Sequence, residues 1–175
     1  MNNETIIVAP HADDEIIGCF EIITNEKIKP IIIYTEEMED ERKQATLKLK
    51  ELTPVKIQLY LRNIPPAALN HTNKFFFPHP IYETHPAHRA QGFVGEQLAR
   101  GGLDVTFYIT EMTAPFKFEC AKPFDKHLLL EDTYPDQSKL WKYDHKYFLF
   151  SGYDKWIFNP LGGFNEKPSI IGGTK

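Results

Sequence analysis

The sequence predicts one α/β domain over residues 1–175, with a Rossmann-like, mostly parallel sheet, helices on both faces and an irregular C-terminal third. Continuous apolar runs at 5–9 and 29–35 are typical of strands that a parallel sheet buries on both faces. Each run is followed by apolar residues at helical spacing, and alternating strands and helices form the pattern of a doubly wound sheet. With 42% apolar and 25% charged residues, the chain can bury a single core.

The first strand is expected over Thr5–Ala9, because Pro10 cannot continue the hydrogen-bond ladder. A helix follows almost at once, marked by apolar residues at helical spacing: Ile16, Cys19, Phe20 and Ile23. Asp13, Asp14 and Glu15 therefore fall above the carboxyl end of the strand, where open α/β sheets place their active sites. The simpler interpretation is that these acids cap the helix and complement its dipole.

His11 favours a functional interpretation of these acids. An imidazole and a carboxylate three residues apart on a tight turn can bind the same divalent ion. The acid between them then faces the side of the ion that has no protein ligand. Neighbouring acids also repel one another, and a cation would relieve that repulsion. The stretch therefore predicts a metal site near His11 and Asp14.

The next elements repeat the order of strand and helix. A second amphipathic helix is marked by Ala45, Leu49 and Leu52 after the strand at 29–35. Residues 55–61 alternate strictly, which indicates a strand buried on one face only and therefore close to an edge of the sheet.

Residues 62–83 show neither the helical nor the strand period. This segment holds Pro65, Pro66, Pro78 and Pro80 around Phe75–Phe77. We therefore expect a long loop that shapes the pocket, with His71 and His79 as surface or packing residues.

A second candidate motif opens a later helix. Pro86 suits the first helical position, Gly101 and Gly102 end the helix, and its apolar residues are Ala90, Phe93, Val94 and Leu98. His85 and His88 then share one side of its N-terminus. Such a pair alone could be a capping and packing feature, but beside the first motif it favours a metal site with two histidines and one aspartate.

The last third of the chain is less regular. A strand is expected at 105–110, followed by short aromatic segments at 147–150 and 156–158. The sequence between them is polar and punctuated by proline.

Composition and charge restrict the possible partners. The formal charge of -4 and the lack of a Lys/Arg block argue against a nucleic-acid partner. No apolar run approaches a membrane span, and a first strand at residue 5 leaves no room for a signal peptide, so a cytoplasmic location is expected. Cys19 and Cys120 are expected to be structural thiols rather than a disulfide or a zinc ribbon.

Two motifs resemble a known family. The stretch Pro10-His11-Ala12-Asp13-Asp14-Glu15 is similar to the His-Pro-Asp-Asp-Glu signature of the LmbE-like (PIG-L) zinc-dependent N-acetylglucosamine deacetylases, with Ala12 in place of proline. The family's later His-x-Asp-His motif is matched by His85-Pro86-Ala87-His88, where Ala87 replaces the aspartate. The similarity covers roughly residues 4–141. The family's Thr-x-Gly-Glu at the end of the second strand is altered, because Thr35 is followed by Glu37 in the glycine position.

The resemblance implies Zn2+, or another divalent transition metal, held by His11, Asp14 and His88 with water at the open position. It also implies Asp13 as general base and a protonated His85 that steadies the oxyanion and protonates the leaving amine. Glu15 would orient His11 from behind, since metal-bound histidines normally need such a partner. Arg42 could bind the substrate, although a solvated helix face is the simpler interpretation.

The protonated state expected for His85 depends on a neighbouring carboxylate that this chain lacks. The family's aspartate between the two histidines would favour the charged imidazolium. With Ala87 there, His85 is expected to lose its proton at lower pH than in relatives, unless another acid such as Glu83 substitutes.

The function implied by the resemblance is removal of an acetyl group from an N-acetylglucosamine-type sugar or sugar conjugate, with no nucleic acid and no membrane as partner. Two alternatives stay open. The protein could hydrolyse another amide with the same metal, or it could be a degenerate metal-binding sugar-recognition protein without turnover. The second alternative is favoured by the changes at Glu37 and Ala87 and by the altered Arg-x-x-Glu helix of the family, in which Arg42 is followed by Gln44 and the glutamate is absent.

Overall fold

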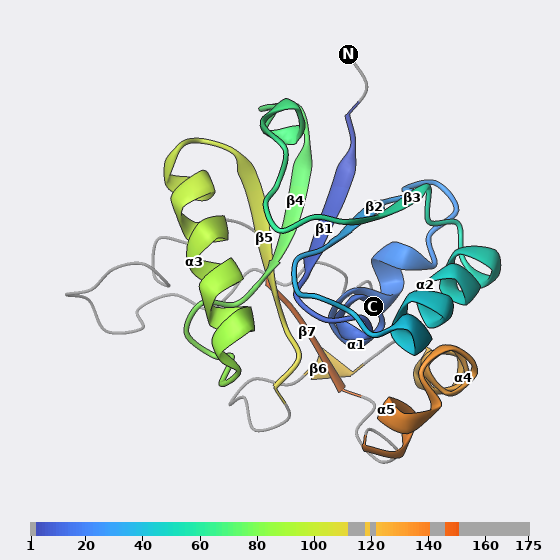
Figure 1. Ribbon diagram of the computed structural model, residues 1–175. Helices are drawn as coiled ribbons and strands as arrows, with labels where there is room; N and C mark the ends of the chain where they lie inside the picture. Colours follow the sequence, from blue (N-terminus) through green and yellow to red (C-terminus); the bar gives the residue numbers. More distant parts are fainter. Residues whose placement is uncertain (1–2, 112–117, 120–121, 141–145, 151–175) are drawn as a thin grey trace.

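The computed structural model describes residues 3–111, 118–119, 122–140 and 146–150 (Figure 1). Its parallel strands are β1 (Thr5–Ala9), β2 (Ile31–Tyr34), β3 (Ile57–Tyr60), β4 (Lys74–Pro78) and β5 (Asp104–Ile109), arranged in the order β3-β2-β1-β4-β5. Strand β7 (Lys146–Phe150) joins β5 antiparallel, and β6 (Phe118–Glu119) pairs with β7. The predicted mostly parallel α/β sheet is confirmed.

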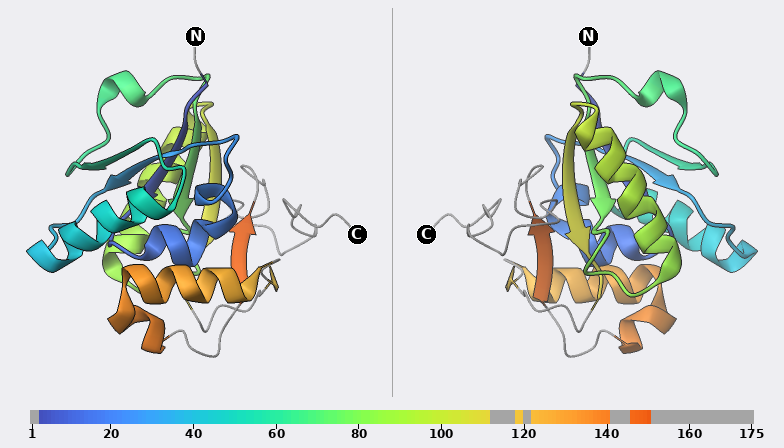
Figure 2. Two further views of the ribbon diagram at one scale, coloured as in Figure 1. Left: turned by 90° about the vertical axis from the view of Figure 1, so that its right-hand side faces the viewer. Right: turned by 90° about the vertical axis from the view of Figure 1, so that its left-hand side faces the viewer.

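Helices cover both faces of this sheet, as predicted. The helices are α1 (Asp14–Ile23), α2 (Asp40–Leu52), α3 (Pro86–Arg100), α4 (Pro123–Thr133) and α5 (Pro135–Leu140), with a short 3-10 turn at Pro66–Ala68. Helix α3 lies on one face, and α1, α2 and α4 lie on the opposite face (Figure 2). Among the described residues, no helix is both long and apolar enough to cross a membrane.

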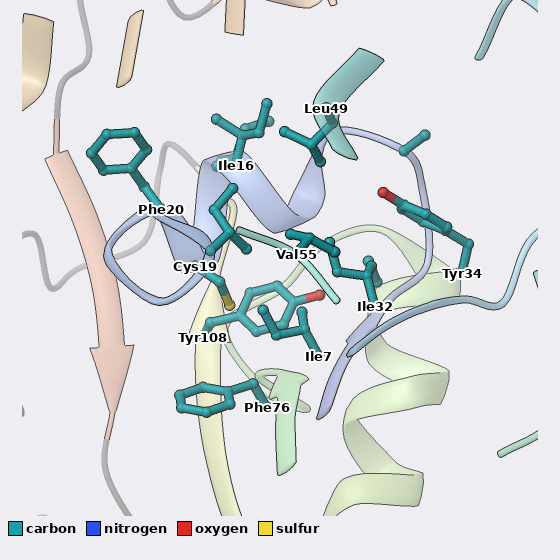
Figure 3. Close-up of a cluster of buried hydrophobic side chains, with 14 of the residues drawn as sticks. Ile7, Ile16, Cys19, Phe20, Ile32, Tyr34, Leu49, Val55, Phe76 and Tyr108 are labelled. Carbon is teal, nitrogen blue, oxygen red and sulfur yellow. The ribbon is translucent and has the colours of Figure 1, made fainter. Parts of the chain in front are cut away.

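The strands bury alternate residues in two separate cores, because successive side chains of a strand point to opposite faces. On the α1 side, Ile7, Ile32 and Phe76 pack with helix residues such as Ile16 and Leu49 (Figure 3). The opposite core, beneath α3, contains the intervening residues Ile6, Val8, Ile33, Phe75 and Phe77. Burial on both faces explains why these strands read as continuous apolar runs rather than as alternating ones.

The prediction of one long loop over 62–83 is wrong, because β4 lies within it at the centre of the sheet. Residues 75–77 are fully or almost fully buried and pair with β1 and β5. The prolines that suggested a loop stand at the end of this strand: Pro78 is its last residue, and Pro80 follows. The edge position predicted for residues 55–61 is confirmed among the described strands, because β3 pairs only with β2.

Helix α3 packs through glycines, Leu98 and Ala99, whereas two of the apolar residues that marked it in the sequence face outward. Phe93 and Val94 are 46% and 42% exposed, whereas Gly92, Gly95 and Ala99 are buried. A Cβ atom on Gly95 would lie 2.7 Å from Cγ of Phe77, and one on Gly92 would lie 2.6 Å from Cα of Pro80. The backbone of α3 therefore approaches β4 more closely than any side chain would allow.

His79 and Cys19 behave as the predicted packing residues. Nδ1 of His79 accepts hydrogen bonds from the backbone N–H groups of Ile81 at 3.1 Å and Tyr82 at 3.2 Å. Its ring is fully buried, and burial lowers its pKa to about 3. Cys19 is a buried free thiol. Cys120 and the segment 156–158 lie outside the described residues.

The close approach of α3 to β4 predicts an unusual response to alanine. Although alanine is about 1 kcal/mol better than glycine in a helix interior, Gly92→Ala should lower the free energy of unfolding by about 1–3 kcal/mol, because backbone atoms must move. Urea unfolding measures this. Gln97→Ala, at an exposed position of the same helix, should change stability by less than about 0.5 kcal/mol. An unchanged or more stable Gly92→Ala protein would contradict the packing.

The neutral, buried His79 predicts a specific acid sensitivity. Its folded pKa lies below the unfolded value of 6.5, so the unfolded state binds the proton first and stability falls as the pH drops from 6.5 toward 3. Between pH 7 and pH 5 this should remove about 2 kcal/mol of unfolding free energy. His79→Asn retains an acceptor and should lose correspondingly less over that range, whereas His71→Asn, at an exposed position, should follow the parent. Parallel pH profiles for all three proteins would refute the assignment.

Candidate metal centre

The candidate site lies at the carboxyl ends of the central strands, above β1, β4 and β5. The turn between β1 and α1 contributes His11, Asp13 and Asp14, and the start of α3 contributes His85 and His88. These five residues line one cavity of about 570 Å³, a volume within the range of small-molecule sites. The two sequence motifs, separated by more than seventy residues, are therefore brought together.

Three histidines lie close enough to bind one metal ion. One ring nitrogen each of His11, His85 and His88 lies within 4.8 Å of the other two. The ring of His85 stands edge-on to that of His11, with centroids 4.6 Å apart. Imidazole nitrogens grouped in this way are ligands that zinc and other divalent transition metals prefer.

Asp14 completes a tighter group with two of these histidines. Oδ2 of Asp14 lies 3.2 Å from Nε2 of His88 and 3.6 Å from Nδ1 of His11, and these two nitrogens are 2.9 Å apart. Ligands of a tetrahedral ion at 2.0–2.2 Å stand about 3.3–3.6 Å from one another. The separations within the triangle of His11, Asp14 and His88 lie in this range or up to about 0.4 Å below it, so small side-chain shifts would let the donor set predicted from the motifs surround such an ion.

Glu83 is the carboxylate that holds His88, a role that no motif in the sequence indicates. The Nδ1–H group of His88 donates to Oε2 of Glu83 at 2.9 Å, and the hydroxyl of Thr110 donates to the same oxygen at 3.0 Å. The backbone N–H of Thr110 donates to the other oxygen, Oε1. A histidine held in this way at Nδ1 presents Nε2 to the cavity, which is the usual arrangement behind a metal-bound histidine. Glu83 therefore supports His88, and not His85 as suggested from the sequence.

The charges of this group depend on one another. Burial alone would raise the pKa of Asp14, but His88 and His11 outweigh it and lower that pKa. Burial disfavours a charged His88, yet Asp14 and Glu83 raise its pKa to about 10. Asp14 and Glu83 therefore favour the imidazolium form of His88 in the absence of metal, and a cation that binds its Nε2 must displace a proton.

Asp13 occupies a constrained position beside the ligand group. Its φ of 139° is rare for a residue with a side chain. Burial, followed by repulsion from Asp14 and Glu15, raises the pKa of its carboxyl. Arg42 opposes that shift, since its Nη1 donates to Oδ2 of Asp13 at 3.3 Å and to the carbonyl of Ala12 at 2.7 Å. Arg42 is therefore part of the cavity wall and not a solvated helix residue.

The predicted role of Glu15 in orienting His11 is wrong, because both of its oxygens have other partners. Oε2 accepts the backbone N–H of Asp13 at 3.0 Å, and Oε1 accepts the hydroxyl of Tyr134 at 2.8 Å. Burial raises the pKa of Glu15 to about 7. Glu15, in the first turn of α1, therefore holds the backbone of Asp13 instead of the ring of His11.

His85 caps α3 and remains at the mouth of the cavity. Its Nδ1 accepts the backbone N–H of Ala87 at 3.3 Å. Partial burial, followed by the nearby rings of His11 and His88, lowers its pKa.

A comparison with protein-family models finds no match, and neither does a comparison with curated protein sequences. The similarity to the LmbE-like deacetylases therefore rests on the two short motifs alone.

The ligand geometry predicts which residues bind a divalent metal. His88→Ala should remove most of the Zn2+ affinity measured by isothermal titration calorimetry, because the two remaining ligands cannot close the site. His85→Ala should retain binding, since Asp14 already completes the triangle. The control His71→Ala, at an exposed position outside the cavity, should bind as the parent does. Loss of Zn2+ in His85→Ala with retention in Asp14→Asn would replace this ligand set by the three histidines.

Proposed function

We propose that this protein is a zinc-dependent N-deacetylase that hydrolyses the acetamide of an N-acetylglucosamine-type sugar. The observation that carries the proposal is the convergence of His11, Asp14 and His88 within 3.6 Å of one another, with the carboxylate of Asp13 in the same cavity. The acetylated sugar as substrate comes from the resemblance of the two motifs to the LmbE-like family.

Two histidines and one carboxylate are a donor set typical of catalytic zinc, which keeps one coordination position open. A Zn2+ ion bound there supplies Lewis-acid chemistry, which acidifies water and polarises a carbonyl oxygen. The chain's own contribution is to hold the three ligands: Glu83 fixes the ring of His88, and the backbone N–H of His11 donates to Oδ2 of Asp14 at 2.8 Å.

Asp13 acts as the general base in this proposal. It lines the cavity next to a proposed ligand, and its own contacts are to Arg42 and, through its backbone, to Glu15. Its carboxylate takes a proton from the water that attacks the acetyl carbon. The C–N bond then breaks, and the products are acetate and a free amine.

His85 is an exposed residue that lines the same cavity as Asp13. In its protonated form it donates a hydrogen bond to the oxyanion that develops on the acetyl oxygen, and it gives its proton to the leaving amine. Its exposed position allows a proton to return from solvent.

One contact favours the alternative of a sugar-binding protein without turnover. The guanidinium of Arg42 pairs with Asp13 and opposes the rise in pKa that burial gives this carboxyl, which makes it a weaker base than it would be without Arg42. Acetate release from N,N′-diacetylchitobiose separates the proposals. Release supports the deacetylase, and binding of the sugar without release supports the recognition protein. Release from a simple aryl acetamide but not from the sugar supports hydrolysis of another amide.

The roles of the two aspartates predict opposite phenotypes. Asp13→Asn should retain zinc and the fold but lose about two to four orders of magnitude in turnover, the usual contribution of a positioned general base. Asp14→Asn should lose zinc, and activity with it. Zinc content by mass spectrometry and acetate release are measured on the same samples. The reverse pattern would mean that ligand and base have been exchanged.

A further inference from the structure

A second cavity of about 350 Å³ adjoins the candidate site. The two cavities share Glu39, Arg42 and Gln137 in their linings, so they meet at the side chain of Arg42. We call this second cavity the outer cavity. It is bounded by the start of α2 on one side and by the junction of α4 and α5 on the other. A substrate larger than the acylated unit would extend into it.

The outer cavity is acidic. Among the described residues its lining contains Glu39, Glu41 and Asp136, against the single cation Arg42. Arg42 is already directed to Asp13 and to the carbonyl of Ala12, and Asp136 pairs with Lys139 at 3.1 Å. Within the described part of the chain, Glu39 and Glu41 have no ion-pair partner.

The helix dipole explains only part of this arrangement. Acidic residues in the first turn of α2 complement its positive end. That reason does not extend to Asp136, which comes from a different helix and lines the same cavity. The carboxylates in the first turn of α2 neutralise the positive end of this helix, so the helix dipole attracts an anionic ligand only weakly.

A buried hydroxyl in the same wall also indicates a ligand. Thr133 is 3% exposed and lines the outer cavity, and its Oγ1 has no hydrogen-bond partner among the described residues. A buried hydroxyl usually has a partner, because leaving it without one costs free energy. A ligand amine or hydroxyl in this cavity could supply it.

We infer that the outer cavity binds a protonated amine on the part of the substrate next to the acetylated unit. This inference rests on the proposed function and specifies its substrate class: an amino-sugar chain with a free amine beside the acetamide. A phosphorylated or nucleotide-linked sugar would place its negative charge against Glu39 and Glu41. The preferred substrate is therefore a partly deacetylated oligosaccharide, the product of an earlier deacetylation.

Binding tests this charge preference without relying on turnover. Three disaccharides without amides are compared on the zinc-loaded protein by calorimetry: the β-1,4-linked glucosamine dimer, the glucose dimer and the phosphorylated glucose dimer. The glucosamine dimer should bind most tightly. Its affinity should exceed that of the glucose dimer by about two- to fivefold for each carboxylate with which its amines pair. This preference should shrink in 0.5 M salt, because exposed charges are screened.

Variants connect the preference to the cavity. In the double variant Glu39→Gln/Glu41→Gln, the affinity ratio of the glucosamine dimer to the glucose dimer should fall toward one. Glu26→Gln removes one negative charge from an exposed turn that precedes β2, at the amino ends of the parallel strands, and should leave the ratio unchanged. Equal or tighter binding of the phosphorylated dimer, or an unchanged ratio in the double variant, would overturn the inference.

The two proposals fail separately. Acetate release from N,N′-diacetylchitobiose without any amine preference would support the deacetylase and overturn the amine site. An amine preference that depends on Glu39 and Glu41, without acetate release from any acetylated sugar, would support the amine site and overturn the deacetylase.

Discussion

The imidazole of His88 between Asp14 and Glu83 is the interaction on which the candidate site depends. The two carboxylates approach its ring nitrogens at 3.2 and 2.9 Å, and all three side chains are buried. Together with Thr110, they join three separate parts of the chain at the carboxyl ends of the strands: the turn after β1, the start of α3 and the end of β5. Because buried carboxylates need a compensating cation, this group is stable only with a proton or a metal ion at its centre.

The sheet places these groups by bringing the carboxyl ends of β1, β4 and β5 side by side. Helix α3 reaches its position because Gly92 and Gly95 let its backbone lie against β4, which sets His88 opposite the turn after β1. The backbone of that turn is constrained in its own way. Glu15, held by Tyr134, accepts the N–H of Asp13 and supports the unusual backbone conformation there. The contacts that pack α3 and α1 into the fold therefore also place the side chains of the candidate site.

Features that depend on a short stretch of chain can be predicted from the sequence, whereas contacts between distant residues cannot. His11 and Asp14 lie on one turn, and His88 opens one helix, so short motifs were sufficient to select them. Glu83 acts on His88 through a loop conformation that no spacing reveals, and Tyr134 meets Glu15 across 119 residues of chain. Strand β4 was missed because prolines at its end concealed a run of buried phenylalanines. Proline occurs at the ends of strands as well as in loops, and only the neighbouring strands with which a segment pairs show that it is a strand.

The central claim is that one metal ion sits among His11, Asp14 and His88. A crystal structure of the zinc-loaded protein, with anomalous diffraction recorded at the zinc edge, tests it most directly. The account predicts one anomalous peak about 2.0–2.2 Å from Nδ1 of His11, Oδ2 of Asp14 and Nε2 of His88, with Glu83 still bonded to Nδ1 of His88. A peak bound by His85 in place of Asp14, or no peak in this cavity, would contradict it.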